Sequence, residues 1–472
     1  MRSLSISSRE SVREMASKDG ELRVFIVAGE VSGDIIASRF MNSLKNLSPF
    51  PIRFAGVGGS MMSKHGLNSL FPLEDISVMG IWELLPHLSK FRARLKETVE
   101  SALVFRPHVV LTVDSKGFNF RFLKHLRAIY DRDRLASLRH FHYVAPSFWA
   151  WRGGEARLKG LSEFVDHIFC ILPFEAEMCR SNGVAATFVG HPTLEDALEL
   201  NVNNLTVTNA FMRNGKFKAT EKSLERNMGF LQPFHTISCS FCSVLDPALI
   251  YIQILALEGA TIISVLPGSR LQEVKRMLSI FSKTMELLKD SHTELTAVIH
   301  VAPNKDVENY IKQAVHEWPI SVVLLPGGSP FTKYNSFSAS RVALCASGTV
   351  AVELQLARLP CVVAYRAHLL TEWYIRYKAK IPYVSLPNIV LESSIIPEAL
   401  FGECTPSNLA SLLMDLMRDT ELREKQISAA NTFFDLVNPV KRVSENSTKK
   451  EHVLFESTTT PSMIASSAVL NS

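Results

Sequence analysis

Two glycine-containing segments in the second half of the chain have residue types that bind phosphate. In the first, the apolar run Thr261–Leu266 leads into Gly268, Ser269 and Arg270, and a helical pattern follows. A helix that starts after a tight glycine turn leaves backbone N–H groups unpaired, and these favour an anion. Arg270 adds a planar, charged fork that fits a phosphate. Taken alone, the segment is equally typical of a simple strand-to-helix turn.

A second segment of the same kind favours the phosphate interpretation. The apolar run 341–345 leads into Ser347, Gly348 and Thr349, and Glu353 lies in the helical pattern that follows. Open α/β sheets bind nucleotides where helices begin at the carboxyl ends of neighbouring strands. The second half of the chain is therefore predicted to hold a phosphorylated ligand.

The best candidate for acid–base chemistry in the first half is Asp114. It directly follows the strand pattern His108–Val113. A carboxylate at the carboxyl end of a central strand faces the ligand crevice, which makes Asp114 the candidate general base. Capping of the next helix is the alternative role for this side chain.

The first apolar run, Arg23–Ala28, ends in a loop of small and acidic residues that includes Glu30 and Ser32. Small residues there would let a sugar approach the backbone closely. They would equally let the next helix pack on the strand. The loop lacks the GxGxxG pattern, so no dinucleotide is inferred.

A parallel sheet in each half would position these residues. Apolar runs alternate with helical patterns in both halves, which predicts two doubly wound α/β domains. The predicted strands are Arg23–Ala28, Ile52–Val57, His108–Val113, Phe141–Val144, Asp166–Leu172, Ala186–Val189, Thr261–Leu266, Ala297–Val301, Val322–Leu325, Arg341–Cys345 and Cys361–Ala364.

At 472 residues the chain is too long for one core. Composition and periodicity divide it into five segments. They are a possible transit or disordered segment (1–22), an N-terminal Rossmann-like domain (23–198), a linker or insertion of uncertain structure (199–259), a C-terminal Rossmann-like domain (260–437) and a low-complexity tail expected to be poorly ordered (438–472).

The segment Val78–Lys96 combines large apolar residues, including Met79 and Trp82, with cations that follow them. This pattern fits a helix that lies on a membrane surface or grips acyl chains. An ordinary amphipathic helix packed on the sheet is the alternative that the pattern by itself favours. Farther along, Trp149 and Trp151 in a proline-containing loop could stack on a sugar or lie against lipid.

Composition excludes several function classes. With 47% hydrophobic and 21% charged residues and a net charge of +5, the chain is a folded protein without the basic face that nucleic acid needs. It has no run of about 18 apolar residues that could span a bilayer. Of seven cysteines only Cys239 and Cys242 form a CxxC, so a metal site is not predicted. Scattered cysteines in apolar runs indicate a reducing compartment.

Several motifs occurring in order resemble the lipid-A-disaccharide synthases, glycosyltransferases of family 19 with the GT-B fold. The resemblance covers roughly 23–198 and 261–412. The motifs that carry it are AGEVSGD (Ala28–Asp34), VMGI (Val78–Ile81), HYVAPSFWAWR (His142–Arg152), GHP (Gly190–Pro192), LPGSR (Leu266–Arg270), ASGTVAVE (Ala346–Glu353) and YVSLPNIV (Tyr383–Val390).

The resemblance implies two Rossmann-like domains that face a cleft. The implied reaction transfers a sugar from UDP-2,3-diacylglucosamine to the 6-hydroxyl of 2,3-diacylglucosamine 1-phosphate (lipid X). It gives the β(1→6) lipid A disaccharide 1-phosphate and UDP, inverts the anomeric centre, and uses no metal or other cofactor. Peripheral attachment to a membrane and a tendency to form homodimers are implied as well.

Matched position by position, the resemblance makes Asp114 the base and Arg270 the diphosphate-binding residue, and Glu353 would hold the ribose hydroxyls. At one site position the chain departs from the family, because the family's Asp-x-Pro reads Asp114-Ser115-Lys116 here. The other implied contacts are Gly268, Ser269, Ser347, Gly348 and Thr349 to UDP, Glu30, Ser32 and Asn388 to the sugars, and Met79 and Trp82 to the acyl chains.

Two further functions remain open at this point. A non-catalytic homologue would bind UDP or acylated sugars without releasing UDP, and another UDP-sugar enzyme of the same fold, such as an epimerase, would use UDP-GlcNAc. For location, a start rich in Arg and Ser, the insertion and the cysteine usage favour mitochondria. The alternative is the cytoplasmic face of an inner membrane, where the bacterial relatives act.

Overall fold

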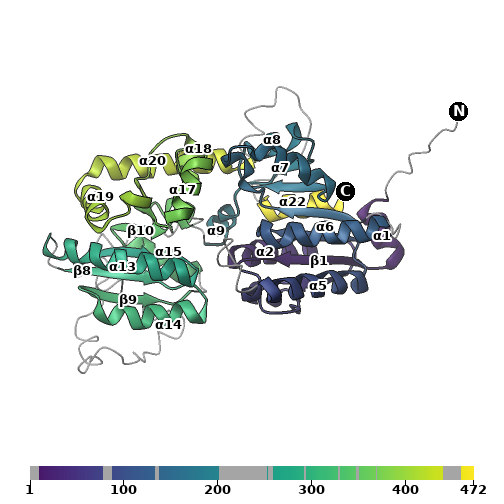
Figure 1. Ribbon diagram of the computed structural model, residues 1–472, viewed down its shortest axis with the longest axis horizontal. Helices are drawn as coiled ribbons and strands as arrows, with labels where there is room; N and C mark the ends of the chain where they lie inside the picture. Colours follow the sequence, from purple (N-terminus) through teal and green to yellow (C-terminus); the bar gives the residue numbers. More distant parts are fainter. Residues whose placement is uncertain are drawn as a thin grey trace. The chain divides into compact units, whose positions relative to one another are not determined.

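The computed structural model describes residues 10–77, 88–132, 138–200, 252, 259–291, 294–327, 330–346, 350–367, 369–439 and 459–472. The chain forms two compact units (Figure 1). The first contains the residues before Glu195 and those after Asp435, and the second contains Glu195–Asp435. Each unit holds one six-stranded parallel sheet, which confirms the predicted α/β class with two doubly wound domains.

The sheet of the first unit has the strand order β2-β1-β3-β4-β5-β6. All its strand pairs are parallel, and the register joins Val24 to Val109 and Val109 to Arg139. Strands buried on both faces read as apolar runs, which is why the sequence predicts them well. The strands are β1 (Leu22–Ala28), β2 (Ile52–Val57), β3 (Val109–Val113), β4 (Arg139–Tyr143), β5 (His167–Cys170) and β6 (Ala186–Phe188).

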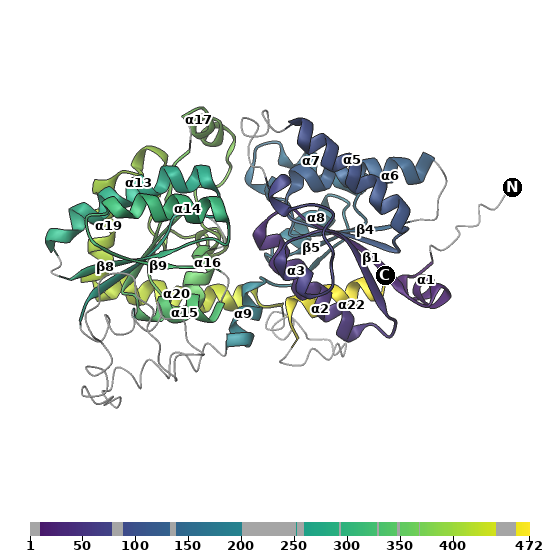
Figure 2. The ribbon, with the colours of Figure 1, turned by 90° about the horizontal axis from the view of Figure 1, so that it is seen from below.

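Helices cover both faces of this sheet. In Figure 2, α5, α6 and α7 lie on one face, and α2 and α22 lie on the other. The helical elements of this unit are α1 (Val12–Asp19), α2 (Val31–Leu47), α3 (Ser60–Lys64), η1 (Leu73–Asp75), α5 (Leu88–Phe105), α6 (Lys116–Arg132), η3 (Ser147–Ala150), α7 (Gly154–Lys159), η4 (Gly160–Glu163), α8 (Glu175–Ser181) and α22 (Pro461–Leu470).

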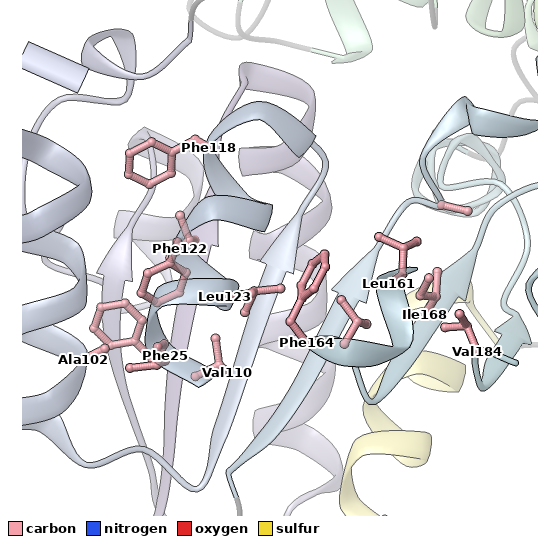
Figure 3. Close-up of a cluster of buried hydrophobic side chains, with 14 of the residues drawn as sticks. Phe25, Ala102, Val110, Phe118, Phe122, Leu123, Leu161, Phe164, Ile168 and Val184 are labelled. Carbon is pink, nitrogen blue, oxygen red and sulfur yellow. The ribbon is translucent and has the colours of Figure 1, made fainter. Parts of the chain in front are cut away.

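The core of the first unit lies between the sheet and helices α5 and α6. Phe25 of β1 packs against Phe122 of α6, with ring centroids 5.8 Å apart. Figure 3 shows these two rings beside Ala102 of α5 and Val110 of β3, all fully buried. Phe91 and Leu95 of α5 are buried in the same core. The described part of the segment Val78–Lys96 therefore packs on the sheet, as the alternative interpretation of that segment stated.

The second unit has the strand order β12-β11-β10-β7-β8-β9, again with parallel pairs only. Five of its six strands match predicted ones. The sixth, β12, was missed because it is short and begins with Glu398, so it does not form an apolar run. The strands are β7 (Thr261–Leu266), β8 (Leu295–His300), β9 (Ser321–Leu325), β10 (Val342–Ala346), β11 (Cys361–Tyr365) and β12 (Glu398–Leu400).

The helices of the second unit also lie on both faces of its sheet (Figure 2). Val274, Met277 and Phe281 of α13 are buried in a large apolar cluster of this unit. The helical elements are α9 (Thr193–Leu200), within which the chain enters this unit, α13 (Leu271–Leu288), η5 (Lys289–Ser291), α14 (Lys305–Ala314), η6 (Val315–Glu317), α15 (Pro330–Ala339), α16 (Val350–Leu356), α17 (Leu369–Lys378), α18 (Leu386–Leu391), η7 (Phe401–Glu403), α19 (Pro406–Arg418) and α20 (Thr420–Val437).

The expectation of a poorly ordered tail is wrong for Pro461–Leu470. This segment is helix α22, and it packs against α2 in the first unit. The hydroxyl oxygens of Ser462 and Ser43 lie 2.7 Å apart, and the Ser466 hydroxyl donates to the carbonyl of Phe40. Small residues let the two helix backbones approach closely, so a serine-rich segment that reads as low complexity packs as a buried helix.

The expectation for the first segment also needs correction. Val12–Asp19 forms helix α1, and the Ser11 side chain caps it in a reciprocal capping box with Glu14. The two hydrogen bonds of the capping box satisfy backbone N–H groups at the helix start and so stabilise this short polar segment as a helix. Among the described helices, none is long and apolar enough to cross a bilayer. Residues 201–251 lie outside the described part.

Candidate active site

In the first unit, the residues predicted to do chemistry follow β1 and β3. Within the sheet, β2 lies on one side of β1, whereas β3 and the later strands lie on the other side of β1. The loops after these two neighbouring strands therefore diverge from a topological switch point, the usual ligand site of an open α/β sheet. The structure brings together the loop of Glu30 and Ser32 and the loop of Asp114 at this edge.

These two loops touch at Gly29. A Cβ atom added to Gly29 would overlap the Cβ of Ser115, and the carbonyl of Gly29 accepts a hydrogen bond of 2.8 Å from the Ser77 hydroxyl. Glycine is required here because the loop after β3 fills the space that a side chain would occupy.

Replacing Gly29 by Ala should lower stability by about 1–3 kcal/mol, the usual cost of overpacking. It should also lower activity, because Ser115 can move away only by displacing the turn that carries Asp114. Urea unfolding and a turnover assay check both effects. Gly160→Ala is the matched control, since a Cβ there meets nothing within 4 Å. Equal stability of the two variants would contradict the steric argument.

The backbone at Asp114 is strained. Asp114 has φ 51° and Ser115 has φ 42°, so two consecutive non-glycine residues adopt the left-handed conformation. Such strain costs of order 1–3 kcal/mol per residue and clusters at functional sites. The N–H of Asp114 donates to the carbonyl of Tyr143 at 3.0 Å, which extends the β3–β4 ladder into the turn. The backbone that carries the half-buried Asp114 side chain is therefore held by the sheet.

Asn119 holds the same turn from the helix side. Its fully buried amide donates to the carbonyls of Val113 at 3.0 Å and Asp114 at 2.9 Å, and it lies 3.4 Å from the carbonyl of Val27. One side chain thus binds the ends of both β1 and β3. Asn119 was not among the residues predicted from the sequence. The available signal was a polar residue at a core position of an amphipathic helix.

Asp34, in the first turn of α2, connects the chain after β1 to the chain after β2. The predicted sugar contacts Glu30 and Ser32 do not make this connection. The buried Asp34 carboxylate accepts hydrogen bonds of 2.8–3.1 Å from the N–H groups of Gly59, Met61 and Met62 and so caps α3. Glu30, at the N-cap of α2, and Ser32 in its first turn are half-buried. A rigid loop with these two side chains at its surface is suited to hold a polar ligand.

Trp149, expected to contact sugar or lipid, is bound inside the first unit. Its indole N–H donates to Oε1 of Glu175 at 3.1 Å, and its ring meets Phe174 edge to face. Oε2 of Glu175 accepts from the N–H of Leu172 at 3.1 Å. Glu175 is 3% exposed, and this burial raises its pKa to about 7. Glu175 therefore joins the loops after β4 and β5.

The raised pKa of Glu175 predicts a pH-dependent stability. Between about pH 4.5 and 7 the folded chain binds one proton that the unfolded chain releases, so the free energy of unfolding should fall as pH rises through this range. The full change is about 3 kcal/mol. Glu175→Gln should remove it, measured as the difference from wild type in urea unfolding at pH 5 and pH 8. The exposed Glu177→Gln is the control, and a constant difference for Glu175→Gln would contradict the prediction.

In the second unit, the two predicted phosphate segments follow β7 and β10. These strands are neighbours, and the chain continues from β7 to β8 on one side whereas β11 lies on the other. Both segments therefore begin at the switch point of this sheet. Gly268 has φ 114°, a conformation that only glycine adopts easily, and its turn leads into α13. This helix begins without a side-chain cap, with the half-buried Arg270 at its N-cap position.

Glu353 carries a buried oxygen that has no partner within the described residues. Its Oε1 accepts an ion-paired hydrogen bond of 2.8 Å from Lys333 of α15, whereas Oε2 is buried and makes no hydrogen bond there. A buried acceptor is costly unless a donor reaches it. The arrangement fits a carboxylate held in place by Lys333 that receives a ligand hydroxyl. No sequence pattern pointed to Lys333, because only packing brings α15 to α16.

Asn388 corrects the sequence prediction, because its side chain is used inside the unit. Nδ2 donates to the carbonyl of Ile396 and to Oε1 of Glu398, and Oδ1 accepts from the N–H groups of Ile395 and Ile396. With all four hydrogen bonds made and no exposed surface, Asn388 shapes its loop instead of lining the sugar site.

Five predicted contacts lie outside the described residues. They are Met79, Trp82, Ser347, Gly348 and Thr349. Cys239 and Cys242 lie outside as well. The five cysteines that the structure does describe are buried free thiols, as expected. No group of three His, Cys, Asp or Glu side chains in the described ranges is placed to hold a metal ion.

Comparison with known proteins agrees with this architecture. A sequence model of the lipid-A-disaccharide synthetase family matches residues 24–212 and 252–452. The probable mitochondrial lipid-A-disaccharide synthase of Arabidopsis thaliana is 56% identical over 471 residues, covering 99% of this chain and 94% of the relative. The lipid-A-disaccharide synthase of Rhodospirillum centenum is 36% identical over 406 residues, covering 86% of this chain and 88% of the relative.

Among solved structures, the UDP-GlcNAc 2-epimerase from Neisseria meningitidis bound to UDP-GlcNAc has a TM-score of 0.53 with 12% identity, covering 90% of this chain and 100% of that chain. This likeness concerns the fold alone, which is the GT-B type. Family membership rests on the sequence matches, which run through both units and both switch points. The chain belongs to the lipid-A-disaccharide synthase family of glycosyltransferases.

Proposed function

We propose that this chain transfers 2,3-diacylglucosamine from UDP to the 6-hydroxyl of 2,3-diacylglucosamine 1-phosphate. The products are the β(1→6) lipid A disaccharide 1-phosphate and UDP. The observation that carries the proposal is the position of Asp114, a carboxylate held in a strained turn at the switch point of the first unit, in a chain of this family. The epimerase alternative is not favoured, since the matching relatives are named as synthases.

Asp114 is proposed as the general base. The acceptor's 6-hydroxyl oxygen forms a bond to the anomeric carbon as the bond from that carbon to the diphosphate breaks. The hydroxyl proton passes to the Asp114 carboxylate. Because the attack comes from the face opposite the leaving group, the anomeric centre inverts. Base assistance of this kind typically contributes about a hundredfold to ten-thousandfold.

Arg270 is proposed to stabilise the charge that develops on the departing UDP. The uncapped start of α13, with Gly268 and Ser269 before it, offers backbone N–H groups to the same diphosphate. Ser347, Gly348 and Thr349 are proposed to do so from the segment after β10. These groups would supply the positive charge and the N–H donors that a metal ion could otherwise supply at the leaving diphosphate.

Glu353 is proposed to accept hydrogen bonds from the ribose hydroxyls. The support is its buried Oε2, which lacks a partner within the described residues, together with the ion pair that fixes Oε1. Glu30 and Ser32 are proposed to contact the sugars, and Met79 and Trp82 the acyl chains.

The acylated substrates also suggest where the enzyme works. We propose that it binds peripherally to a membrane, in mitochondria, as the name of the Arabidopsis relative suggests, and that it forms a homodimer. Fractionation of organelles followed by a salt wash tests the first two points. Light scattering of the purified protein tests the third.

The proposed activity is tested with purified protein, UDP-2,3-diacylglucosamine and 2,3-diacylglucosamine 1-phosphate. UDP release that requires both substrates, with a disaccharide 1-phosphate found by mass spectrometry, is the expected result. UDP binding without release in the presence of both substrates would favour a non-catalytic role. Conversion of UDP-GlcNAc to its 2-epimer would instead assign the epimerase activity.

A further inference from the structure

Two cationic side chains converge on one aromatic ring beside Asp114. Lys116, the first residue of α6, places Nζ 5.4 Å from the ring centroid of Phe148. Arg157 of α7 places Cζ 5.9 Å from the same centroid. Both side chains are exposed at the surface, whereas Phe148 is 8% exposed and firmly packed. The ring is therefore a fixed platform for two cations that are close enough for the charge of Arg157 to act on Lys116.

Neither cation has an anionic partner in contact. Within the described residues, Lys116 and Arg157 form no ion pair and no side-chain hydrogen bond. Desolvation lowers the pKa of Lys116, the charge of Asp114 raises it, and the charge of Arg157, a smaller effect, lowers it. The charge of Asp114 therefore offsets the repulsion that Arg157 exerts on Lys116, and both cations stay available to an anionic ligand.

The start of α6 adds hydrogen-bond donors to this charge. The N–H groups of Phe118 and Asn119 bond to the carbonyl of Ser115. The N–H groups of Lys116 and Gly117 have no such acceptor within the described residues. Gly117 is exposed, so a ligand can approach the backbone there. Free amides at a helix start and two unpaired cations are independent features that favour the same kind of ligand, a phosphate.

We propose that Lys116, Arg157 and the start of α6 bind the phosphate monoester of the acceptor sugar. This inference rests on the proposed function. The acceptor carries its reacting hydroxyl at C6 and its phosphate at C1, so the base and the phosphate site must lie within one sugar ring of each other. Asp114 and Lys116, two residues apart, meet that requirement. The donor's diphosphate is assigned to the second unit, at Arg270.

Lys116 supplies a cation and, as the first residue of α6, a backbone N–H donor. The site should therefore raise the preference of this enzyme for a phosphorylated acceptor over its dephosphorylated form. Phe148 and the aliphatic stem of Lys116 would limit access of water to the bound phosphate.

The test compares wild type with Lys116→Met, Arg157→Met and the double variant, using acceptor with and without the 1-phosphate. Each single change should raise KM for the phosphorylated acceptor about tenfold to a hundredfold. KM for UDP-2,3-diacylglucosamine and for the dephosphorylated acceptor should stay unchanged. Lys116→Arg should retain most of the affinity. Lys124→Met is the matched control, because Lys124 lies on the same helix with Nζ 4.8 Å from the ring centroid of Phe164.

Calorimetric titration with micellar acceptor separates this inference from the proposed function. One outcome supports the phosphate site but not the proposed reaction. In that case wild type binds the phosphorylated acceptor, the Met variants bind it more weakly, and neither wild type nor any variant transfers sugar. If wild type transfers sugar and the variants keep the acceptor KM, the inference is overturned. A lowered kcat with a shifted pH profile and an unchanged acceptor KM would assign Lys116 to tuning Asp114 instead, and would also overturn it.

Discussion

Replacing Asp114 by Asn should lower kcat for UDP release by about a hundredfold to ten-thousandfold while KM for both substrates changes little. Asn keeps the size of the side chain but cannot accept the proton of the acceptor hydroxyl at neutral pH. It also tolerates the left-handed conformation that Asp114 adopts, with φ 51°, better than most residues do. A steady-state assay of UDP release with both substrates measures the effect.

The choice of Asn rather than Ala separates chemistry from folding. Ala at a positive φ would add strain, so a loss of activity in Asp114→Ala would have two explanations. The Asn variant should unfold at the same urea concentration as wild type. Activity within tenfold of wild type in this folded variant would exclude Asp114 as the base and would leave helix capping as its role.

Replacing Arg270 by Met should lower kcat/KM for the UDP-sugar by about a hundredfold to a thousandfold and weaken the binding of UDP. The reason is that Arg270, at the N-cap of an uncapped α13, supplies the fixed positive charge at the leaving diphosphate. Arg270→Lys should recover only part of the loss, since a lysine keeps the charge but not the planar pair of donors. UDP titration and turnover assays measure the two effects separately.

Lys275→Met is the control for this prediction. Lys275 lies one turn farther along the same helix, is exposed, and has Nζ 5.5 Å from the ring centroid of Tyr310. Its replacement removes one positive charge from α13 without touching the turn at Gly268. An equal loss of UDP affinity in both variants would mean that the general field of the helix, and not Arg270, binds the diphosphate.

The strands of both sheets could be predicted because parallel strands are buried on both faces. All eleven predicted strands are present. Runs such as Val109–Val113 have no solvent-exposed face, so they appear in the sequence as continuous apolar runs. The strand Glu398–Leu400 was missed because it is short and begins with a charged residue, so it does not form an apolar run. Helix α22 was missed for a different reason, since its serines make the segment look polar although Ser462 and Ser466 are buried.

The residues of the site also divide into those that the sequence predicted and those that it did not. Asp114 and Gly268 stand out in the sequence because both lie within two residues of a strand end, and strand ends are where ligands bind. Asn388 was assigned to the sugars, but its amide is saturated by the backbone of Ile395 and Ile396 and by the Glu398 carboxylate. Asn119 and Lys333 were not predicted from the sequence. Asn119 contacts the carbonyl of Val27, which is distant in sequence, and Lys333 contacts Glu353, which lies on another helix.

The sequence by itself determined the two parallel sheets, the loops that end them, and the family of glycosyltransferases, because each depends on local apolar runs and on motifs with fixed spacing. Only the tertiary structure decided how the loops are braced. It placed Gly29 against Ser115, the Asn119 amide across two strand ends, and Lys116 and Arg157 on one ring. These contacts join segments far apart in the chain, and packing rather than local pattern determines which side chains meet.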